Sequence, residues 1–241
     1  MKTANSLWVR FRWHLQTGAW QDPRGAKVMR LLKRSLWEEV AVQINVCNII
    51  GLVADLRSVK EPSVVEAMER AVEIVEGVFE KMRNLLKAGA SEKDLATAVQ
   101  RARTDRGCGL MHPGAVAAGE RTAFPHAQPS DRCVEARDLV WFDVCAEADG
   151  LHSDLTRTST VGEPAPRRND IFDVACEPQK KAREAIRSGM KCSEVDGICR
   201  LHIDKAGYGE YFTHRTGHGL GLEIHEPPYM VSGSNMVLKP A

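Results

Sequence analysis

Asp138-Leu-Val-Trp-Phe-Asp-Val-Cys-Ala-Glu-Ala-Asp-Gly-Leu-His-Ser-Asp-Leu-Thr-Arg-Thr-Ser-Thr-Val161 is the stretch that decides the fold. Residues 139–146 are apolar and rich in strand formers, and residues 155–161 alternate and are rich in β-branched side chains. Between them lies Asp149-Gly150, a pair typical of tight hairpin turns because glycine tolerates a positive φ. The stretch therefore predicts a β-hairpin.

Two acids of this hairpin, Asp143 and Asp154, fall on one face of the sheet in either of two registers. If the turn centres on Asp149-Gly150, Asp143 faces Thr156. Asp154 is then its diagonal neighbour. A slightly earlier centre makes the two acids face each other, and both registers leave their Cβ atoms roughly 5–8 Å apart.

Asp143 is unusual because it interrupts a run that otherwise resembles a buried strand. A buried carboxylate is costly unless it is paired or bound to a metal. We interpret the two acids as oxygen ligands for one or two divalent cations. Two surface acids on a hairpin are the alternative.

Length, charge and cysteines limit the class of protein. At 241 residues the chain is long enough for one or two domains with a substantial core, and a net charge of +1 gives no global electrostatic case for a nucleic-acid or membrane partner. Its longest apolar run, about residues 46–54, is too short to span a bilayer. The 7 cysteines are odd in number, irregularly spaced and without a Cys-x-x-Cys pair, which indicates reduced thiols in the cytoplasm.

Residues 1–53 differ from the rest and are interpreted as a shortened or divergent N-terminal segment. Most of the tryptophans lie here, and Arg10 and Arg12 interrupt the first apolar stretch, which argues against a signal peptide. Alternating tryptophan and arginine could suggest stacking of these side chains on single-stranded nucleic acid. We favour a shortened or divergent N-terminal segment instead. One helix is expected over residues 27–46.

Two helices are expected before the hairpin. Pro62 is typical of a first helical turn, and apolar residues recur at helical spacing as far as Gly89, which ends this helix. Ser91 and Asp94 form a capping box that opens a second helix to about residue 103.

Two further helices are expected after the hairpin. Asn169 is predicted to cap a third helix that ends before Gly189, and Pro178 should kink this helix or shift its start. Ser193 with Asp196 is predicted to open a fourth helix, which ends at about residue 206. Because Gly89 and Gly189 occupy equivalent places, the chain suggests two related halves with a site between them.

Three histidines stand among glycines in residues 211–229. His214 and His218 are four residues apart, as in a helical zinc site, but the intervening and following glycines make a helix improbable. Those glycines instead allow close backbone approach, and residues 222–225, ending at His225, are expected to form a strand. Three histidines so close together indicate a site.

Together these motifs resemble the creatinase/methionine aminopeptidase family, the pita-bread metallopeptidases, and most of all its Xaa-Pro dipeptidase and aminopeptidase P branch. The resemblance covers about residues 54–239, roughly three quarters of the chain. The motifs are Phe-Pro-His126-Ala, Asp143 with Ser-Asp154-Leu-Thr-Arg-Thr, and His214-Arg-Thr-Gly-His218-Gly-Leu-Gly-x4-His225-Glu-Pro-Pro.

The resemblance implies an α+β pita-bread fold. Two pseudo-symmetric helix-helix-strand halves would surround a curved antiparallel sheet. Residues 1–53 would be the divergent N-terminal segment, and residues 54–241 an incomplete, C-terminally truncated pita-bread domain. The family's remaining two metal ligands are glutamates on later strands.

The resemblance also implies a reaction, the metal-dependent hydrolysis of the bond between an N-terminal residue and proline. Two divalent ions are expected, Mn²⁺ first, with Co²⁺ or Zn²⁺ as alternatives. Asp143 would bind one ion, Asp154 would bridge both, and His218 would bind the second. A water between the ions would attack the scissile carbonyl.

The resemblance gives the other histidines a role in substrate binding. His126 and His225 would contact the substrate and stabilise the oxyanion, and His214 would line the same pocket. The expected partners are short peptides with proline in second position, with a homodimer left open and no nucleic acid or membrane.

Two residues depart from the family pattern. Cys145 stands where the family usually has glycine, and Arg137 stands where the turn before the strand prefers glycine. A catalytically inactive pita-bread protein or fragment that binds peptides or partners therefore remains an alternative, as does a creatinase-like non-peptidase. The sequence Glu226-Pro-Pro favours the peptidase branch.

Overall fold

The computed structural model describes residues 50–109, 111 and 114–240. The chain divides into two units, residues 1–50 and 51–241, and nearly all of the described residues belong to the second unit. The tryptophan-rich stretch and the helix expected over residues 27–46 lie outside the described residues. The boundary at residue 53 stays a prediction.

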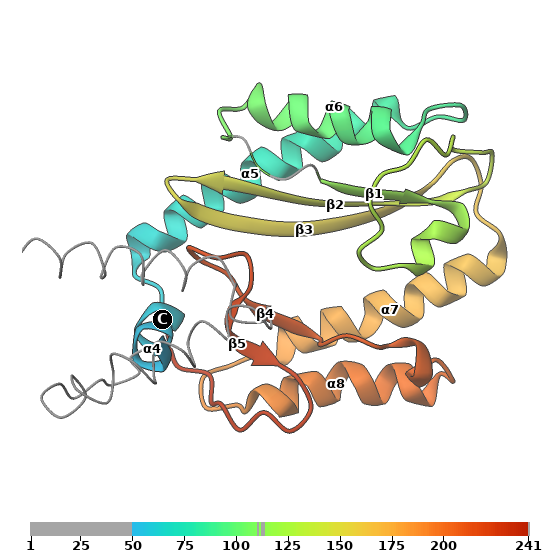
Figure 1. The fold of residues 1–241 in the computed structure, drawn as a ribbon. Helices are drawn as coiled ribbons and strands as arrows, with labels where there is room; N and C mark the ends of the chain where they lie inside the picture. The colour runs from blue at the N-terminus through green and yellow to red at the C-terminus, as the bar shows by residue number, and fades with distance from the viewer. Residues whose placement is uncertain (1–49, 110, 112–113, 241) are drawn as a thin grey trace, which may run out of the picture. The chain divides into compact units, whose positions relative to one another are not determined.

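The first half of the second unit contains a three-stranded antiparallel sheet in the order β1-β2-β3, against which α5 and α6 pack (Figure 1). Helix α5 buries one apolar stripe because its alanine, valine and methionine side chains recur at helical spacing. The elements are α4 (Ile50–Ser58), α5 (Pro62–Leu85), α6 (Glu92–Thr104), β1 (Ala115–Ala118), η2 (Gly119–Ala123), β2 (Leu139–Ala148) and β3 (Leu151–Thr160).

The hairpin of β2 and β3 has the register centred on Asp149-Gly150. Both turn residues have positive φ, 52° for Asp149 and 79° for Gly150, as a tight hairpin turn requires. Asp143 pairs with Thr156, and Cys145 pairs with Asp154. The prediction of diagonal acids on one face is therefore confirmed, and the register with the acids directly opposed is wrong.

The second half pairs α7 with α8 and packs α8 against β5 of a two-stranded antiparallel sheet. Its elements are α7 (Pro166–Ala185), α8 (Cys192–Lys205), η3 (Gly209–Tyr211), β4 (Gly217–Gly219) and β5 (Glu226–Met230).

Two predicted helix starts are wrong. Helix α7 begins at Pro166 rather than after Asn169, because proline has no N–H to leave unpaired and its φ already suits the first turn. Helix α8 begins at Cys192 rather than after Ser193. Here the Glu194 carboxylate reaches back to accept from the N–H of Lys191, 2.6 Å away, and so supplies the cap.

Other expectations also need correction. Helix α5 ends at Leu85, before Gly89. Pro178 lies inside α7, so the alternative in which it shifts the helix start is wrong, and the kink stays a prediction. Residues 222–225 are a bend rather than a strand, because β5 begins at Glu226.

The two halves repeat one local geometry around their glycines. Gly89 has a φ of 88° and donates to the carbonyl of Val134 over 2.8 Å. Gly189 has a φ of 90° and donates to the carbonyl of Leu238 over 2.9 Å. In each half, the turn before the second helix, α6 or α8, is thus hydrogen-bonded in the same way to a segment that follows later in the chain.

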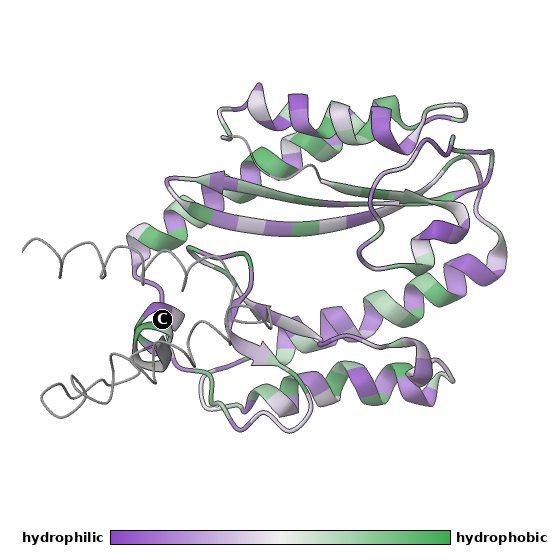
Figure 2. Cartoon of the chain, viewed as in Figure 1, coloured by the Kyte–Doolittle hydropathy of each residue, from purple (hydrophilic) through white to green (hydrophobic). Residues whose placement is uncertain are grey.

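The largest apolar cluster of the described residues lies in the first half, between α5, α6 and the sheet. It includes the side chains of β2 that face the helices, Val140, Phe142, Val144 and Ala146. Figure 2 shows polar and apolar residues alternating along α5, α6 and α7, as expected for helices with one buried face. Among the described residues, no helix is both long and apolar enough to cross a membrane.

Candidate metal centre

The two hairpin acids lie on the face of β2 and β3 that points away from the helices. Thr156 donates from its hydroxyl to Asp143 over 2.8 Å, and the Cys145 thiol donates to Asp154 over 3.6 Å. Burial raises the pKa of Asp143, the hydrogen bond from Thr156 partly offsets this, and the charge of Asp154 raises the pKa further. A cation between the two carboxylates would remove this repulsion.

The Cys145 thiol is held protonated in this site. Burial and the charges of Asp154 and Asp143 raise its pKa to about 12. A protonated thiol is a weak hydrogen-bond donor and neither a nucleophile nor a metal ligand. Cys145 therefore supports Asp154 in the chain as described.

Asp154 meets two histidines that come from the other half of the repeat. One ligand atom each from Asp154, His218 and His225 lie within 4.8 Å of one another. The Nε2 atom of His218 is 3.4 Å from Oδ2 of Asp154, and the ring centroids of His218 and His225 are 4.3 Å apart. Strands β3 and β4 thus bring two predicted ligands, distant in sequence, to one point.

The protonation of the two rings suits a metal. Nδ1 of His218 lies 3.0 Å from the carbonyl of Gly219, which can only accept, so Nδ1 carries the proton. Nε2 then faces Oδ2 of Asp154 at 3.4 Å, so that a cation placed there contacts both atoms. Burial and the charge of His218 lower the pKa of His225, which favours its neutral form.

This donor set fits a divalent metal ion. Carboxylate oxygen and neutral imidazole nitrogen together suit Mn²⁺, Co²⁺ and Zn²⁺. Asp143 is on the same face as Asp154 and stands within electrostatic reach of it.

The remaining two predicted residues differ in position. His126 is exposed in the loop after η2 and interacts electrostatically with Asp143 and His225. The described contacts of His214 are elsewhere: Nδ1 is 2.8 Å from the carbonyl of Arg215, and the ring packs edge-on against Phe212. Electrostatic interactions thus link His126 to the site, whereas the described contacts of the His214 ring are with Phe212 and Arg215.

The glycines of the histidine loop make room for the chain itself. A Cβ atom at Gly219 would collide with the carbonyl oxygens of Glu226 and Pro227, and one at Gly221 would collide with the carboxylate of Glu226. The close approach predicted from these glycines is therefore an approach to β5 and its first side chain.

The segment before His218 is held by a buried acid, Asp196, for which the predicted role in capping α8 with Ser193 is wrong. Asp196 accepts from Arg200 over 2.8 Å and from the hydroxyl of Thr216 over 2.7 Å. Arg200 also donates to the carbonyl of Phe212 over 3.0 Å. The spacing of Asp196 and Arg200, one helical turn apart, was the available signal.

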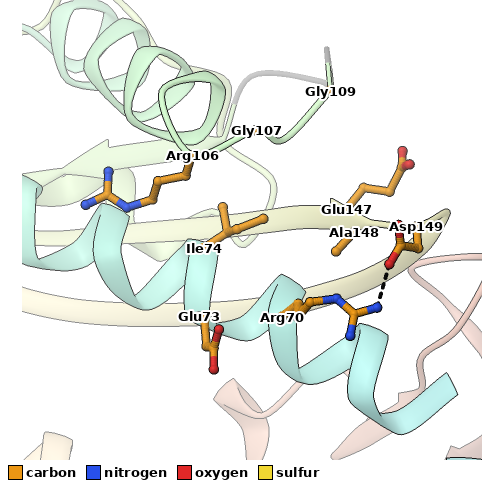
Figure 3. A pocket seen from close by; sticks show the side chains of 9 residues that line it. All are labelled: Arg70, Glu73, Ile74, Arg106, Gly107, Gly109, Glu147, Ala148 and Asp149. Atoms are coloured by element: carbon orange, nitrogen blue, oxygen red, sulfur yellow. Dashed lines mark hydrogen bonds and ion pairs between the residues drawn. The ribbon is translucent and has the colours of Figure 1, made fainter. Parts of the chain in front are cut away.

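A cavity of about 510 Å³ lies away from this site, between α5, the residues after α6 and the tip of the hairpin (Figure 3). It contains none of the six predicted residues. Arg70 is paired with Asp149 over 2.5 Å, and Arg106 points away from that pair (Figure 3). Arg106 packs instead against Gly77 and donates to the carbonyl of Ala102.

Comparison with known proteins agrees with the fold. Residues 66–241 match the model of metallopeptidase family M24, and the chain belongs to this family. The Xaa-Pro dipeptidase of Pyrococcus furiosus is 36% identical over 193 residues, which are 80% of this chain and 56% of that protein. The probable dipeptidase PepE of Mycobacterium tuberculosis is 37% identical over 186 residues, 77% of this chain and 50% of that one.

A solved structure extends the likeness to three dimensions. The recombinant prolidase of Thermococcus sibiricus superposes with a TM-score of 0.81 at 32% identity, over 91% of this chain and 58% of that one. The pita-bread fold predicted from the sequence is confirmed. The chain spans about half the length of the curated relatives that it matches.

Proposed function

We propose that this site serves the metal-dependent hydrolysis of the peptide bond between an N-terminal residue and proline. The observation that carries the proposal is the cluster of Asp154, His218 and His225, whose ligand atoms lie within 4.8 Å of one another. The names of the relatives, Xaa-Pro dipeptidase and dipeptidase, support the substrate class.

Asp143, Asp154 and His218 are the residues proposed to hold two divalent ions, Mn²⁺ first, with Co²⁺ or Zn²⁺ as alternatives. Metal bound here would lower the pKa of water and polarise the scissile carbonyl. Thr156 and Cys145 orient the two carboxylates, because each donates a hydrogen bond to one oxygen and leaves the other oxygen for a cation.

The histidines are proposed to bind the substrate. His126 and His225 would donate hydrogen bonds to the carbonyl oxygen as negative charge develops on it. Its lowered pKa keeps His225 neutral near pH 7, so it offers one donor and one acceptor. His214 remains a proposed pocket residue.

The proposed partners are short peptides with proline in second position, and a homodimer is left open. The described cysteines are all free thiols, which suits the reducing cytoplasm.

The test is the release of free proline from Ala-Pro by the chain after incubation with Mn²⁺, with Pro-Ala as the reversed control. We expect hydrolysis of Ala-Pro alone, and loss of at least 100-fold in Asp154→Asn. His202→Gln is the matched control, since His202 lies on α8 and pairs with Glu177 rather than with the site. Metal binding without proline release would contradict the proposal and favour a binding protein.

A further inference from the structure

A second charged cluster surrounds Glu226, the residue that follows His225 in the chain. The carboxylate of Glu226 is only 5% exposed, and two cations hold it. Arg57 donates from Nη2 to Oε2 over 2.5 Å, and Lys60 donates from Nζ to Oε1 over 2.5 Å. Each carboxylate oxygen therefore has its own cationic partner.

Glu226 is placed to fix the loop that carries His225. It follows His225 directly and is the first residue of β5. Its carboxylate packs against Gly221 and accepts from the N–H of Glu223 over 3.4 Å. Arg57 also approaches Glu223, at 3.5 Å. One side chain thus closes the bend over residues 221–226.

The other end of this loop is held from the first half of the repeat. The carbonyl of Gly221 accepts from the backbone N–H of His152 over 2.9 Å, and Nδ1 of His152 lies 3.1 Å from the same oxygen. His152 lies two residues before Asp154 on β3. The bend is therefore anchored at Gly221 by β3 and at Glu226 by Arg57 and Lys60.

The cost of burying this cluster suggests that it does more than stabilise the fold. Desolvating a carboxylate and two cations offsets most of their mutual attraction, so apolar side chains of similar size would often serve stability as well. An arginine and a lysine, however, fix both oxygens of Glu226 in direction. Burial raises the pKa of Glu226, but the hydrogen bonds and charges of Lys60 and Arg57 more than offset this, so the carboxyl stays ionised.

We propose that Arg57 and Lys60 are positioning residues of the metal centre: through Glu226, which pairs with Gly219 next to His218, they hold the loop from His218 to His225 and so keep His218 beside Asp154. This inference rests on the proposed metal site. Both residues precede residue 66, where the match to the family model begins. The last turn of α4, with Arg57, and the segment between α4 and α5, with Lys60, would thereby help to position the site.

The test measures metal binding rather than hydrolysis. Co²⁺ is titrated into the full chain and followed by its visible absorption, in the parent, Lys60→Met, Lys60→Arg and Glu226→Gln. Residues that orient metal ligands from outside typically change affinity 10- to 100-fold. We expect Lys60→Met and Glu226→Gln to weaken Co²⁺ binding about 10-fold or more and to alter the spectrum. Lys60→Arg keeps the positive charge and should bind Co²⁺ with the affinity and the spectrum of the parent.

Lys93→Met is the matched control, because Lys93 forms an exposed ion pair with Asp131 at 2.8 Å. It should leave binding unchanged. Equal Co²⁺ affinity in the parent and in Lys60→Met would overturn the positioning role alone, whereas a parent that binds no Co²⁺ would overturn the metal site as well. If Lys60→Met fails to fold by circular dichroism, Glu226→Gln decides, because glutamine keeps the shape of the side chain.

Discussion

The two halves of the repeat share a backbone frame and differ in how they are held together. In the first half, a large apolar cluster joins α5 and α6 to the strands. In the second half the buried apolar cluster of the described residues is small: Ala182, Val195 and Cys199, with partly buried neighbours.

Buried ion pairs and hydrogen bonds accompany this small cluster in the second half. Asp196 gathers Arg200 and Thr216, and Glu226 gathers Arg57 and Lys60. The candidate site divides in the same way, since its acids stand on the well-packed hairpin, and His218 and His225 stand on the segment held by ion pairs. The well-packed hairpin and the histidine loop thus meet at Asp154 and His218.

The largest effect is expected from the apolar core. Phe142→Ala should lower the free energy of unfolding by roughly 3–5 kcal/mol, because it empties a position that is only 3% exposed. Phe212→Ala, in the second half, should cost less because Phe212 is only partly buried. Urea unfolding checks both, with the exposed Phe172→Ala as control, expected within about 0.5 kcal/mol. Equal losses of unfolding free energy in Phe142→Ala and Phe212→Ala would contradict the difference in packing between the two halves.

A smaller effect is expected at the polar hub of the second half. Asp196→Asn should cost about 2 kcal/mol, since the side chain is 1% exposed and its hydrogen bonds to Arg200 are charge-assisted. Asp131→Asn removes an exposed carboxylate and should change stability by less than about 0.5 kcal/mol. If the two substitutions had the same effect in urea, Asp196 would not be a hub.

Lowering the pH should reduce the stability of both halves, because each contains a buried, hydrogen-bonded carboxylate: Glu92 in the first half and Asp196 in the second. Burial raises the pKa of Glu92 and of Asp196, but hydrogen bonds more than offset this, so both values fall below the ordinary range. For Glu92 the hydrogen bonds come from Ser130 and Ala118, and for Asp196 from Arg200 and Thr216.

The sign of the pH effect follows from these lowered values. The unfolded carboxyls bind protons near pH 4, before the folded ones, so stability is full above about pH 5 and falls as the pH drops through the folded pKa values. Urea midpoints measured between pH 3 and pH 7 should show this fall, and Glu92→Gln should make it shallower. An unchanged slope in Glu92→Gln would show that this carboxylate has the same pKa folded and unfolded.

The smallest effect is expected at the turn before β2. Arg137 has a φ of 69°, which costs a non-glycine residue about 1 kcal/mol, so Arg137→Gly should raise stability by about that amount. Its neighbour is the control: Ala136→Gly should lower stability slightly, because glycine only loosens the unfolded chain there. A thermal melt in which both variants lose stability would contradict the strain at Arg137.

Local chemistry made the first half easier to predict than the second. Asp149-Gly150 set the hairpin register, and Ser91 accepts from the N–H of Asp94 as the capping box predicted. In the second half Asn169 had the chemistry of a cap, but Pro166 had already begun the helix. Side-chain preference alone does not decide between two starts one turn apart.

The sequence predicted which residues form the site, but not which residues hold them in position. The acids and histidines could be recognised in the sequence because an acid interrupts an apolar strand and three histidines stand among glycines. The partners of Glu226 do not, because Arg57 and Lys60 are 169 and 166 residues away in the chain and resemble ordinary surface cations. Only the folded arrangement shows that they are neighbours.

The most direct test of a centre shared between the halves is calorimetric titration of Mn²⁺ into the chain, Asp154→Asn and His218→Gln. Each variant removes one ligand from one half. We predict that either change alone weakens Mn²⁺ binding at least 10-fold. Unchanged affinity in His218→Gln, with loss in Asp154→Asn, would mean that the hairpin acids bind metal alone and would contradict a shared centre.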